Sequence, residues 1–334
     1  MRFIQVGVGG FGRVWLDVID KDRRAKMVGL VDLNGKALEG ACEKYGYDES
    51  ICYTSLATAL KEADAEALVC STPPAVHRKQ VVAGLKAGLH VISEKPMAES
   101  MADCKAMLAA AEKTGNVYVV SQNYRYRPET YTMAQLVQKG TIGEIGQVKV
   151  DFYKGIGFGG FRAQMPYPLL IDMSIHHFDL IRYITRLNPV SVRGEAWNPK
   201  WSHFKGDCSN SVVFTMSNEA RVLYNGSWCA KGDYCDWNGN WLIEGTRGTI
   251  VYRKGTITLN SAPNDYRVEK SGEMPLRKMR KTQQSAVLDN FIKCIKSGDR
   301  PHTDVQDNIH SIGMVFAAVN AVKTGRQVSL GKSG

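Results

Sequence analysis

The feature that most constrains the fold is a glycine-rich segment close to the N-terminus. An apolar run of strand type, 2–6, leads directly into Gly7-Val8-Gly9-Gly10-Phe11-Gly12, and helical spacing of apolar residues follows. A second apolar run, 27–31, ends in Asp32, 20 positions after Gly12. Strand, G-x-G-x-x-G, helix, strand and acid, in that order, are typical of a dinucleotide site in a parallel α/β sheet. A glycine-rich turn without a ligand is the alternative, but the position between a strand and a helix favours the dinucleotide site.

The motif glycines of this segment each have a physical role in the predicted dinucleotide site. Gly7 permits the tight turn, Gly9 lets the backbone approach a pyrophosphate, and Gly12 lets the helix pack closely on the strand. The open N–H groups at the start of the helix face the phosphates. The cofactor-binding residues expected here are Gly7, Gly9, Gly10, Phe11 and Gly12.

Asp32 decides which dinucleotide we expect. Its carboxylate accepts hydrogen bonds from an adenosine ribose and repels a 2′-phosphate, which favours NAD over NADP. Lys36 lies nearby in the sequence and softens this preference.

Composition places the chain among ordinary soluble globular proteins. With 334 residues, 44% hydrophobic and 23% charged, it is long enough for two domains. No apolar run approaches ~18 residues, so no membrane-spanning helix is expected. The N-terminus enters the first strand directly, which leaves no room for a signal peptide.

Charge and cysteine usage exclude several function classes. The net charge is +10, but the two densest basic clusters, 21–26 and 277–281, are not interleaved with aromatic residues, so no nucleic-acid partner is expected. The eight cysteines are scattered without a C-x-x-C pair. This pattern favours reduced thiols in a cytoplasm over a zinc site or a disulfide framework, and no metal is expected.

Short apolar strands alternate with helices as far as residue 122. This alternation predicts a doubly wound parallel sheet of six strands, covered on both faces, as an N-terminal Rossmann domain over 1–122. Ligands bind beyond the carboxyl ends of such strands, so we expect several segments to share one rim. The rim residues are Ser71, Thr72, Pro73, Glu94, Lys95, Gln122 and Asn123. Lys95 is an ordinary surface charge on its own, but at this rim it is suited to stabilise developing negative charge.

The pattern changes over 123–330. Consecutive strands without helices between them predict a C-terminal α+β domain with a large, mostly antiparallel open sheet. The predicted strands are 146–153, 190–197, 209–216, 220–228, 237–243, 248–252 and 256–260, and the predicted helices are 129–139, 283–297 and 305–323. Five of the six tryptophans lie here, either in the core or on an open sheet face that packs against a second subunit. The tail 331–334 is predicted to be disordered.

A helix predicted over 168–183 carries the second set of candidate residues. Asp172, His176 and Asp179 fall on one stripe at i, i+4 and i+7. A single histidine on such a face is more often a core residue, but two carboxylates in register orient an imidazole and stabilise its charged form. A general base for alcohol oxidation needs this arrangement. His177 points elsewhere on the helix and is interpreted as structural or peripheral.

Five motifs together carry a resemblance to a known family. They are Gly7 to Gly12, Ser71-Thr72-Pro73, Glu94-Lys95-Pro96, Asn123-Tyr124-Arg125 and Asp172-x-x-x-His176-x-x-Asp179. In this order and spacing the chain resembles the glucose–fructose oxidoreductase/inositol dehydrogenase/MocA (Gfo/Idh/MocA) family over nearly its whole length. The resemblance implies a Rossmann domain, a C-terminal domain whose open sheet forms homodimers or homotetramers, and nicotinamide-dependent chemistry on a sugar or polyol.

The same resemblance implies roles for individual residues. Lys95, before a cis proline bond, matches the catalytic lysine and His176 the general acid or base. Asp172 matches an acid that binds substrate or tunes the histidine, and His77 a position near the cofactor. Many members carry a glycine-rich run before the acid, where this chain has 166–170. The substrate residues expected from these segments are Tyr124, Arg162, Asp172, His176 and Asp179.

The sequence therefore predicts an NAD-dependent dehydrogenase acting on a secondary hydroxyl of a sugar, cyclic polyol or glycoside. Two alternatives stay open. One is an enzyme that retains its cofactor and uses transient oxidation for elimination or epimerisation. The other is a non-catalytic regulator that senses NAD, which the presence of both Lys95 and His176 disfavours.

Overall fold

In the computed structural model, which describes residues 1–232 and 234–331, six parallel strands form the first sheet. The predicted tail therefore lies mostly outside the described residues. The sheet order is β3-β2-β1-β4-β5-β6, the doubly wound order that the alternation predicts. The strands are β1 (Arg2–Val6), β2 (Lys26–Val31), β3 (Cys52–Tyr53), β4 (Ala67–Cys70), β5 (His90–Ser93) and β6 (Tyr118–Val120).

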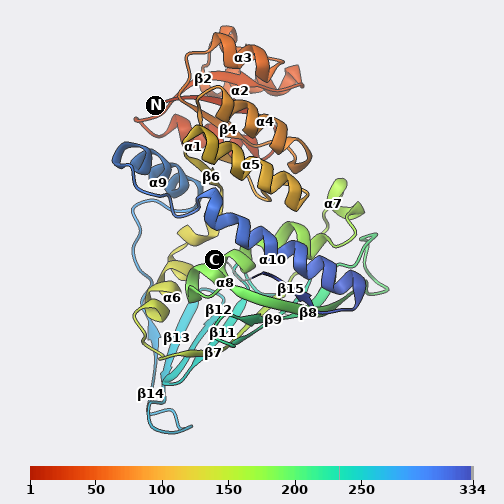
Figure 1. Ribbon diagram of the computed structural model, residues 1–334, viewed down its shortest axis with the longest axis vertical. Coiled ribbons are helices and arrows are strands. Elements are labelled where there is room, and N and C mark those ends of the chain that lie inside the picture. The colour runs from red at the N-terminus through yellow and green to blue at the C-terminus, as the bar shows by residue number, and fades with distance from the viewer. Residues whose placement is uncertain (233, 332–334) are drawn as a thin grey trace. The chain divides into compact units, whose positions relative to one another are not determined.

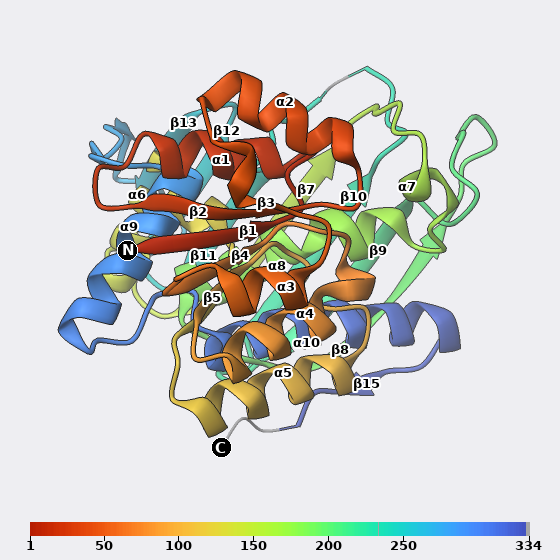
Figure 2. The same cartoon turned by 90° about the horizontal axis from the view of Figure 1, so that it is seen from above.

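Helices cover both faces of this sheet. Figure 2 shows α1 and α2 on one side of β1 and β2, and α3, α4 and α5 on the other. Side-chain caps fix where two of them start: the Ser55 hydroxyl accepts from the Thr58 N–H at 3.4 Å, and the Ser100 hydroxyl from the Asp103 N–H at 3.1 Å. The helices are α1 (Gly12–Asp20), α2 (Gly35–Tyr45), α3 (Leu56–Glu62), α4 (Pro74–Lys86) and α5 (Met101–Thr114), with the short η1 (Glu49–Ile51) before β3.

The chain divides into two compact units, and the first takes a segment from near the C-terminus. It comprises Met1–Asn123 and Lys281–Ile309, whereas the sequence assigned all of 123–330 to the second domain. The reason is helix α9 (Gln283–Ser297), which follows Lys281 and lies against α1. The Phe291 ring lies 6.4 Å from that of Phe3, between centroids. Helical periodicity reveals the apolar stripe of α9, but it does not show which sheet the stripe covers.

The second unit, Tyr124–Arg280 with the segment from His310, contains a nine-stranded sheet. Its order is β14-β13-β12-β11-β7-β10-β9-β8-β15, antiparallel except for the pair β7 and β10. The strands are β7 (Ile145–Tyr153), β8 (Pro189–Trp197), β9 (Ser209–Met216), β10 (Arg221–Ser227), β11 (Asn240–Gly245), β12 (Gly248–Arg253), β13 (Thr256–Ser261), β14 (Lys270–Met274) and β15 (Val328–Ser329).

Three details of this sheet differ from the prediction. Strands β14 and β15 were not predicted, because β14 is polar and exposed without alternation and β15 has only two residues. Strand β11 begins at Asn240 rather than at 237, so Trp237 lies in the preceding loop. The sheet is nevertheless the large, mostly antiparallel sheet that the sequence predicts.

Helices pack on one face of the second sheet. In Figure 1, α6 and α8 lie beside that sheet. The Phe178 ring of α8 packs edge-on against Phe214 and Tyr224, with centroids 4.9 and 5.1 Å away. The helical elements are η2 (Asn123–Tyr126), α6 (Pro128–Gln138), α7 (Phe161–Gln164), η3 (Leu169–Met173), α8 (Ser174–Thr185) and α10 (Val305–Thr324). None of the helices among the described residues is long and apolar enough to cross a bilayer.

The predicted helix over 168–183 is not regular. Residues Leu169–Met173 form a π-helical turn, in which the Ser174 N–H donates to the Leu169 carbonyl, and α8 begins only at Ser174. Asp172 therefore belongs to the wider turn, while His176 and Asp179 belong to α8. Such turns insert one extra residue into a helix and are frequent at functional sites.

Candidate functional site

The glycine turn after β1 is built from close backbone contacts. Gly7 has a φ of +86°, and a Cβ there would lie 2.9 Å from the Ser71 carbonyl oxygen. A Cβ on Gly12 would lie 2.1 Å from the Gly7 oxygen, so both positions require glycine. The Gly7 carbonyl accepts from the Ser71 hydroxyl at 2.6 Å and from the Gln5 amide at 2.9 Å. The turn is therefore held rigidly by β1 and by the segment after β4.

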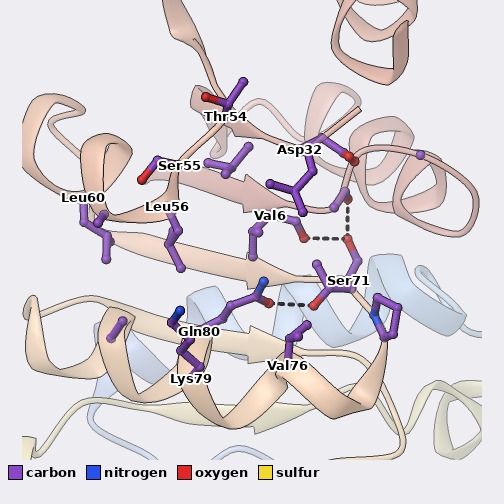
Figure 3. A pocket seen from close by; sticks show the side chains of 18 residues that line it. Val6, Asp32, Thr54, Ser55, Leu56, Leu60, Ser71, Val76, Lys79 and Gln80 are labelled. Carbon is purple, nitrogen blue, oxygen red and sulfur yellow. Dashed lines mark hydrogen bonds between the residues drawn. The ribbon is translucent and has the colours of Figure 1, made fainter. Parts of the chain in front are cut away.

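A cavity of about 840 Å³ opens beside this turn. Figure 3 shows it running between α3 and α4, with Asp32 and Ser71 toward one end and Leu60 toward the other. Apolar side chains form most of its wall, including Leu33, Leu56, Leu60, Val76 and Ala83. Its shape and lining suit the adenosine half of a dinucleotide, whose flat base needs apolar walls. Gly9 lies on the lining, and a Cβ there would touch only the Ala37 methyl group, at 3.7 Å, so its missing side chain leaves space for a ligand.

Asp32 lies at the end of β2 on the lining of this cavity. One carboxylate oxygen accepts from the Val8 N–H and the other from the Asn34 N–H, each at 2.9 Å. A carboxylate has about four acceptor positions, so two remain for ribose hydroxyls. Gly10, with a φ of +45°, and Phe11, 52% exposed, lie at the start of α1 beside the same turn.

The segment after β4 is fixed from behind by α4. Thr72 and Pro73 line the cavity, and the Thr72 hydroxyl donates to the Gln80 side-chain oxygen at 2.6 Å. His77 is fully buried, with its Nε2 2.7 Å from the Thr72 carbonyl oxygen and its Nδ1 3.2 Å from that of Met97. Burial lowers the pKa of His77. His77 thus joins the segment after β4 to the segment after β5 rather than lining the cavity itself.

Glu94 and Lys95 follow β5 directly. Glu94 is buried and accepts from the Trp15 indole N–H at 2.9 Å, and burial raises its pKa despite that bond and the nearby Lys95 charge. The bond from Lys95 to Pro96 is cis, as the resemblance implies. Asn123 lies after β6 at the end of the first unit and is buried. The predicted residues of the first unit thus follow the ends of five strands, β1, β2, β4, β5 and β6.

In the second unit, His176 lies flat against an aromatic ring. The centroids of His176 and Tyr124 are 3.9 Å apart and the ring planes differ by 10°. Arg127 covers the same tyrosine ring, with its Cζ 3.3 Å from the centroid. Arg127 also donates to the Asn238 side-chain oxygen at 2.7 Å. His176 is 5% exposed, so its ring is almost fully enclosed.

The two acids of the predicted stripe each contact an arginine. Asp172 accepts from the Arg162 Nε at 2.7 Å, and the Arg162 guanidinium also lies over the Phe161 ring. Asp179 accepts from two Arg125 nitrogens at 2.7 and 2.6 Å and from the Ser311 hydroxyl at 2.8 Å. Since Asp179 is 1% exposed, this ion pair is internal to the unit.

His177 is structural in its surroundings. It is fully buried, with its Nδ1 3.0 Å from the Tyr224 hydroxyl and its Nε2 3.2 Å from the Trp237 carbonyl oxygen. Burial lowers its pKa to about 3. Among the described residues, no group of three or more histidine, cysteine or acidic side chains is placed to hold a metal ion.

Two family models match the chain in sequence. Residues 1–122 match the Gfo/Idh/MocA oxidoreductase family, NAD-binding Rossmann fold, and residues 130–251 match the Gfo/Idh/MocA C-terminal domain. The chain belongs to the Gfo/Idh/MocA family. It is thus an oxidoreductase whose N-terminal domain is an NAD-binding Rossmann fold, and the cavity with its glycine turn and Asp32 fits that cofactor.

Relatives of this Gfo/Idh/MocA protein match it over nearly its whole length. D-apiose dehydrogenase of Paraburkholderia graminis is 24% identical, covering 97% of this chain and 88% of the relative. Inositol 2-dehydrogenase of Rhizobium meliloti is 25% identical over 99% of both chains. An oxidoreductase from Agrobacterium radiobacter, solved with NAD+, L-tartaric acid and magnesium, shares the fold with a TM-score of 0.89, 19% identity and 98% coverage of both chains.

Several residues that hold the candidate site of this Gfo/Idh/MocA protein in place were not predicted from the sequence. Gln5 is fully buried and donates to the Gly7 and Gly12 carbonyls, at 2.9 and 2.7 Å. Its position in an otherwise apolar strand could have revealed this role, because a buried polar group requires a hydrogen-bond partner. Gln80, Trp15 and Arg127 carried no such signal, since they occupy ordinary helix or turn positions.

Proposed function

We propose that this chain is an NAD-dependent dehydrogenase that transfers hydride between nicotinamide and a secondary hydroxyl of a sugar, cyclic polyol or glycoside. The observation that carries the proposal is the enclosed imidazole of His176, held parallel to the Tyr124 ring at 3.9 Å. A fixed, nearly buried imidazole is suited to exchange a proton with one substrate hydroxyl. The relatives named for apiose and inositol support the class of substrate.

His176 acts as the general base in this proposal. It takes the proton from the substrate hydroxyl as the C–H bond breaks, and it returns that proton in the reverse direction. Asp172 and Arg162, joined at 2.7 Å, bind neighbouring hydroxyls of the substrate, and Tyr124 forms one wall beside the imidazole. Asp179, already paired with Arg125, positions α8 rather than contacting substrate.

Lys95 supplies positive charge in this proposal. Its ammonium group hydrogen-bonds the substrate oxygen and stabilises the negative charge that develops there. The proline that follows Lys95 and the buried Glu94 that precedes it restrict the backbone around it.

NAD, when bound, supplies the acceptor for the hydride that leaves the substrate carbon. Gly7, Gly9, Gly10, Phe11 and Gly12 hold the pyrophosphate, and Asp32 holds the adenosine ribose. Ser71, Thr72, Pro73, Glu94 and Asn123 complete the rim toward the nicotinamide. Because the Asp32 carboxylate lies on the cavity wall, we expect NADP to bind more weakly than NAD.

The test combines a substrate screen with two single variants. Sugars and cyclic polyols are screened for formation of reduced nicotinamide, with NAD and NADP in parallel. With the best substrate, Lys95→Met and His176→Asn should each lower kcat by about 10²- to 10⁴-fold. Lys105→Met and His203→Gln are controls that should retain full activity. Near wild-type turnover in either Lys95→Met or His176→Asn contradicts the proposed mechanism.

We further propose that the open face of the second sheet joins two subunits. One register row on the face opposite α8 contains Val213, Leu223, Leu242 and Val251, around Lys149. These apolar side chains are only partly covered within the chain. Mass measurement of the native protein should give a homodimer or homotetramer, and Leu223→Glu should dissociate it. A wild-type monomer contradicts the proposal.

The cytoplasm is the proposed place of action. All eight cysteines are free thiols in the structure, which suits a reducing compartment. Fractionation of the source cells with an antibody to the chain tests this.

A further inference from the structure

Two cysteines of the first unit lie in direct contact. The sulfur atoms of Cys42, on α2, and Cys52, on β3, are 3.3 Å apart. Both side chains are partly exposed, so small reagents reach them. A disulfide requires the two sulfur atoms to approach to about 2.05 Å, so little movement separates the observed thiols from a bond.

The pair lies beside the walls of the cofactor cavity. Strand β3 is a two-residue edge strand, and within the part of the chain that the structure describes it pairs only with Leu30 and Val31 of β2. Thr54, Ser55 and Leu56 follow it directly and line the cavity. The start of α2 is also tied to the site, because the N–H of its N-cap residue Asn34 donates to Asp32.

We propose that Cys42 and Cys52 form a reversible disulfide that fastens the edge strand β3 to α2 and so fixes one wall of the adenosine cavity. An edge strand held by only two residue pairs is easily displaced, and the segment 54–56 moves with it. A covalent link to α2 removes that freedom. A cavity wall fixed in its binding geometry gives tighter NAD binding, because less ordering remains to be done on binding. The effect on affinity rests on the proposed cofactor site, whereas the disulfide itself does not.

The oxidant is a low-molecular-weight disulfide such as glutathione disulfide. The Cys42 thiolate attacks one sulfur of the oxidant, forming a mixed disulfide and releasing one glutathione thiolate. Cys52 then gives up its proton and attacks the Cys42 sulfur, which releases the second glutathione. The two protein thiols lose two electrons and two protons, and the oxidant is reduced to two thiols.

The order of these steps follows from the surroundings of Cys52. Burial, with the neighbouring Cys42, raises the pKa of the Cys52 thiol to about 12. Cys52 is therefore protonated at neutral pH, which disfavours it as the first nucleophile.

The second unit supplies a matched control pair. The Cys208 and Cys229 sulfur atoms are 3.2 Å apart, but these side chains are only 0% and 8% exposed. Cys208 is enclosed further by Ser202 and Asn198, at 3.2 and 3.4 Å. Distance alone thus does not distinguish the two pairs, whereas access does, and only the Cys42–Cys52 pair should react with a dissolved disulfide.

The experiment uses the full chain, reduced and then incubated with glutathione disulfide at neutral pH. Digestion without reductant and mass spectrometry should detect a peptide linking Cys42 to Cys52, with a loss of two hydrogen atoms that dithiothreitol reverses. Cys42→Ser and Cys52→Ser should abolish the link, and the double variant C208S/C229S should retain it. Oxidation should lower the Kd for NAD by about threefold in the wild type and in C208S/C229S, and not in Cys42→Ser.

The outcomes separate this proposal from the proposed function. Absence of the Cys42–Cys52 peptide, or a link only between Cys208 and Cys229, overturns the disulfide. The link with an unchanged or raised Kd for NAD overturns its effect on the cavity. If neither the reduced nor the oxidised protein binds NAD, the proposed function fails while the peptide still decides the disulfide.

Discussion

The imidazole of His176 and the phenol ring of Tyr124 are stacked, with centroids 3.9 Å apart and planes 10° apart. Arg127 lies 3.3 Å from the centroid of the same phenol ring, and it must cover the opposite face because both groups lie directly over the ring. Tyr124 is therefore enclosed between an imidazole and a guanidinium. This layered packing fixes the plane of the imidazole through a residue of η2, which the sequence placed only among the substrate contacts.

Removal of the Tyr124 ring should disorder the proposed base without removing it. We expect Tyr124→Ala to lower kcat by about 10- to 100-fold, because the imidazole loses the surface that fixes its plane. Tyr124→Phe keeps the stacked ring and should retain most of the activity. Steady-state kinetics of both variants with the best substrate checks this. Equal losses in the two variants would show that the hydroxyl, rather than the stacking, is what matters.

The ion pair between Arg125 and Asp179 should matter for stability. Both side chains are almost fully buried, at 6% and 1% exposure, and two hydrogen bonds join them. Arg125→Met leaves the Asp179 charge buried and should lower the free energy of unfolding by about 3–5 kcal/mol. The double variant R125M/D179L should recover part of that loss, because no charge then remains buried.

Urea unfolding measures these changes, and an exposed pair serves as a control. Arg78 and Asp103 are 2.9 Å apart, with Arg78 60% exposed, so Arg78→Met should cost less than about 1 kcal/mol. If Arg125→Met costs no more than Arg78→Met, the buried pair does not stabilise the second unit as its geometry implies.

The first unit was predictable from the sequence because its signals are local. The glycines and Asp32 lie within one strand–helix–strand unit, where backbone geometry fixes their spacing, and Gly7, Gly9 and Asp32 line one cavity. The contribution of α9 was not predictable. Its contact with α1 joins segments that are distant in the chain, and an apolar stripe does not identify its partner.

The candidate residues of the second unit show the same limit, because contacts between distant segments leave no local pattern in the sequence. Helical spacing placed His176 and Asp179 on one stripe, and both belong to α8. The sequence did not reveal that Asp179 pairs with Arg125, because that residue lies 54 positions away. It also did not reveal the π-helical turn at Asp172, since an inserted residue leaves no mark in an apolar pattern.

Two glycines of the turn should separate binding from folding. In Gly9→Ala the new methyl group meets only the Ala37 side chain, at 3.7 Å, so stability should be preserved while the Kd for NAD rises at least about tenfold. In Gly12→Ala the methyl group would lie 2.1 Å from the Gly7 oxygen, so stability and NAD binding should both fall. Calorimetry with and without NAD measures both quantities. Gly9→Ala binding NAD as tightly as wild type would place the pyrophosphate elsewhere.

Asp32 should control the choice of cofactor. Asp32→Ser removes the charge that repels a 2′-phosphate, so the ratio of the NADP Kd to the NAD Kd should fall by about tenfold or more. Some loss of NAD affinity should accompany it, since the ribose hydroxyls lose an acceptor. Titration of both cofactors checks this, with Asp103→Asn on α5 as a control that should change neither affinity. An unchanged ratio would show that Asp32 only holds the Val8 and Asn34 N–H groups.

His177 should make the second unit sensitive to acid. Its hydrogen bonds suit the neutral ring, with Nε2–H donating to the Trp237 carbonyl and Nδ1 accepting from the Tyr224 hydroxyl. Burial lowers its folded pKa to about 3, against about 6.5 in the unfolded chain. Above pH 6.5 neither state binds the proton. Below that pH the unfolded state gains a proton that the folded state does not, so stability falls by about 1.4 kcal/mol for each pH unit down to about 3.

A comparison of variants separates the contribution of His177 to the pH dependence of stability from that of other titrating groups. His177→Gln keeps one donor and one acceptor but does not titrate. The variant loses the buried imidazole ring, so it should be less stable than wild type at pH 8. Because only the wild type then loses stability through proton uptake by His177 in its unfolded state, the difference should shrink as the pH falls toward 4. His203→Gln, at an exposed position, is the control for replacing a histidine that is not buried. Urea unfolding followed by intrinsic fluorescence suits this test, because five of the six tryptophans belong to the second unit. A difference between wild type and His177→Gln that stays constant with pH would mean that His177 is protonated in the folded state or that protons reach it without cost.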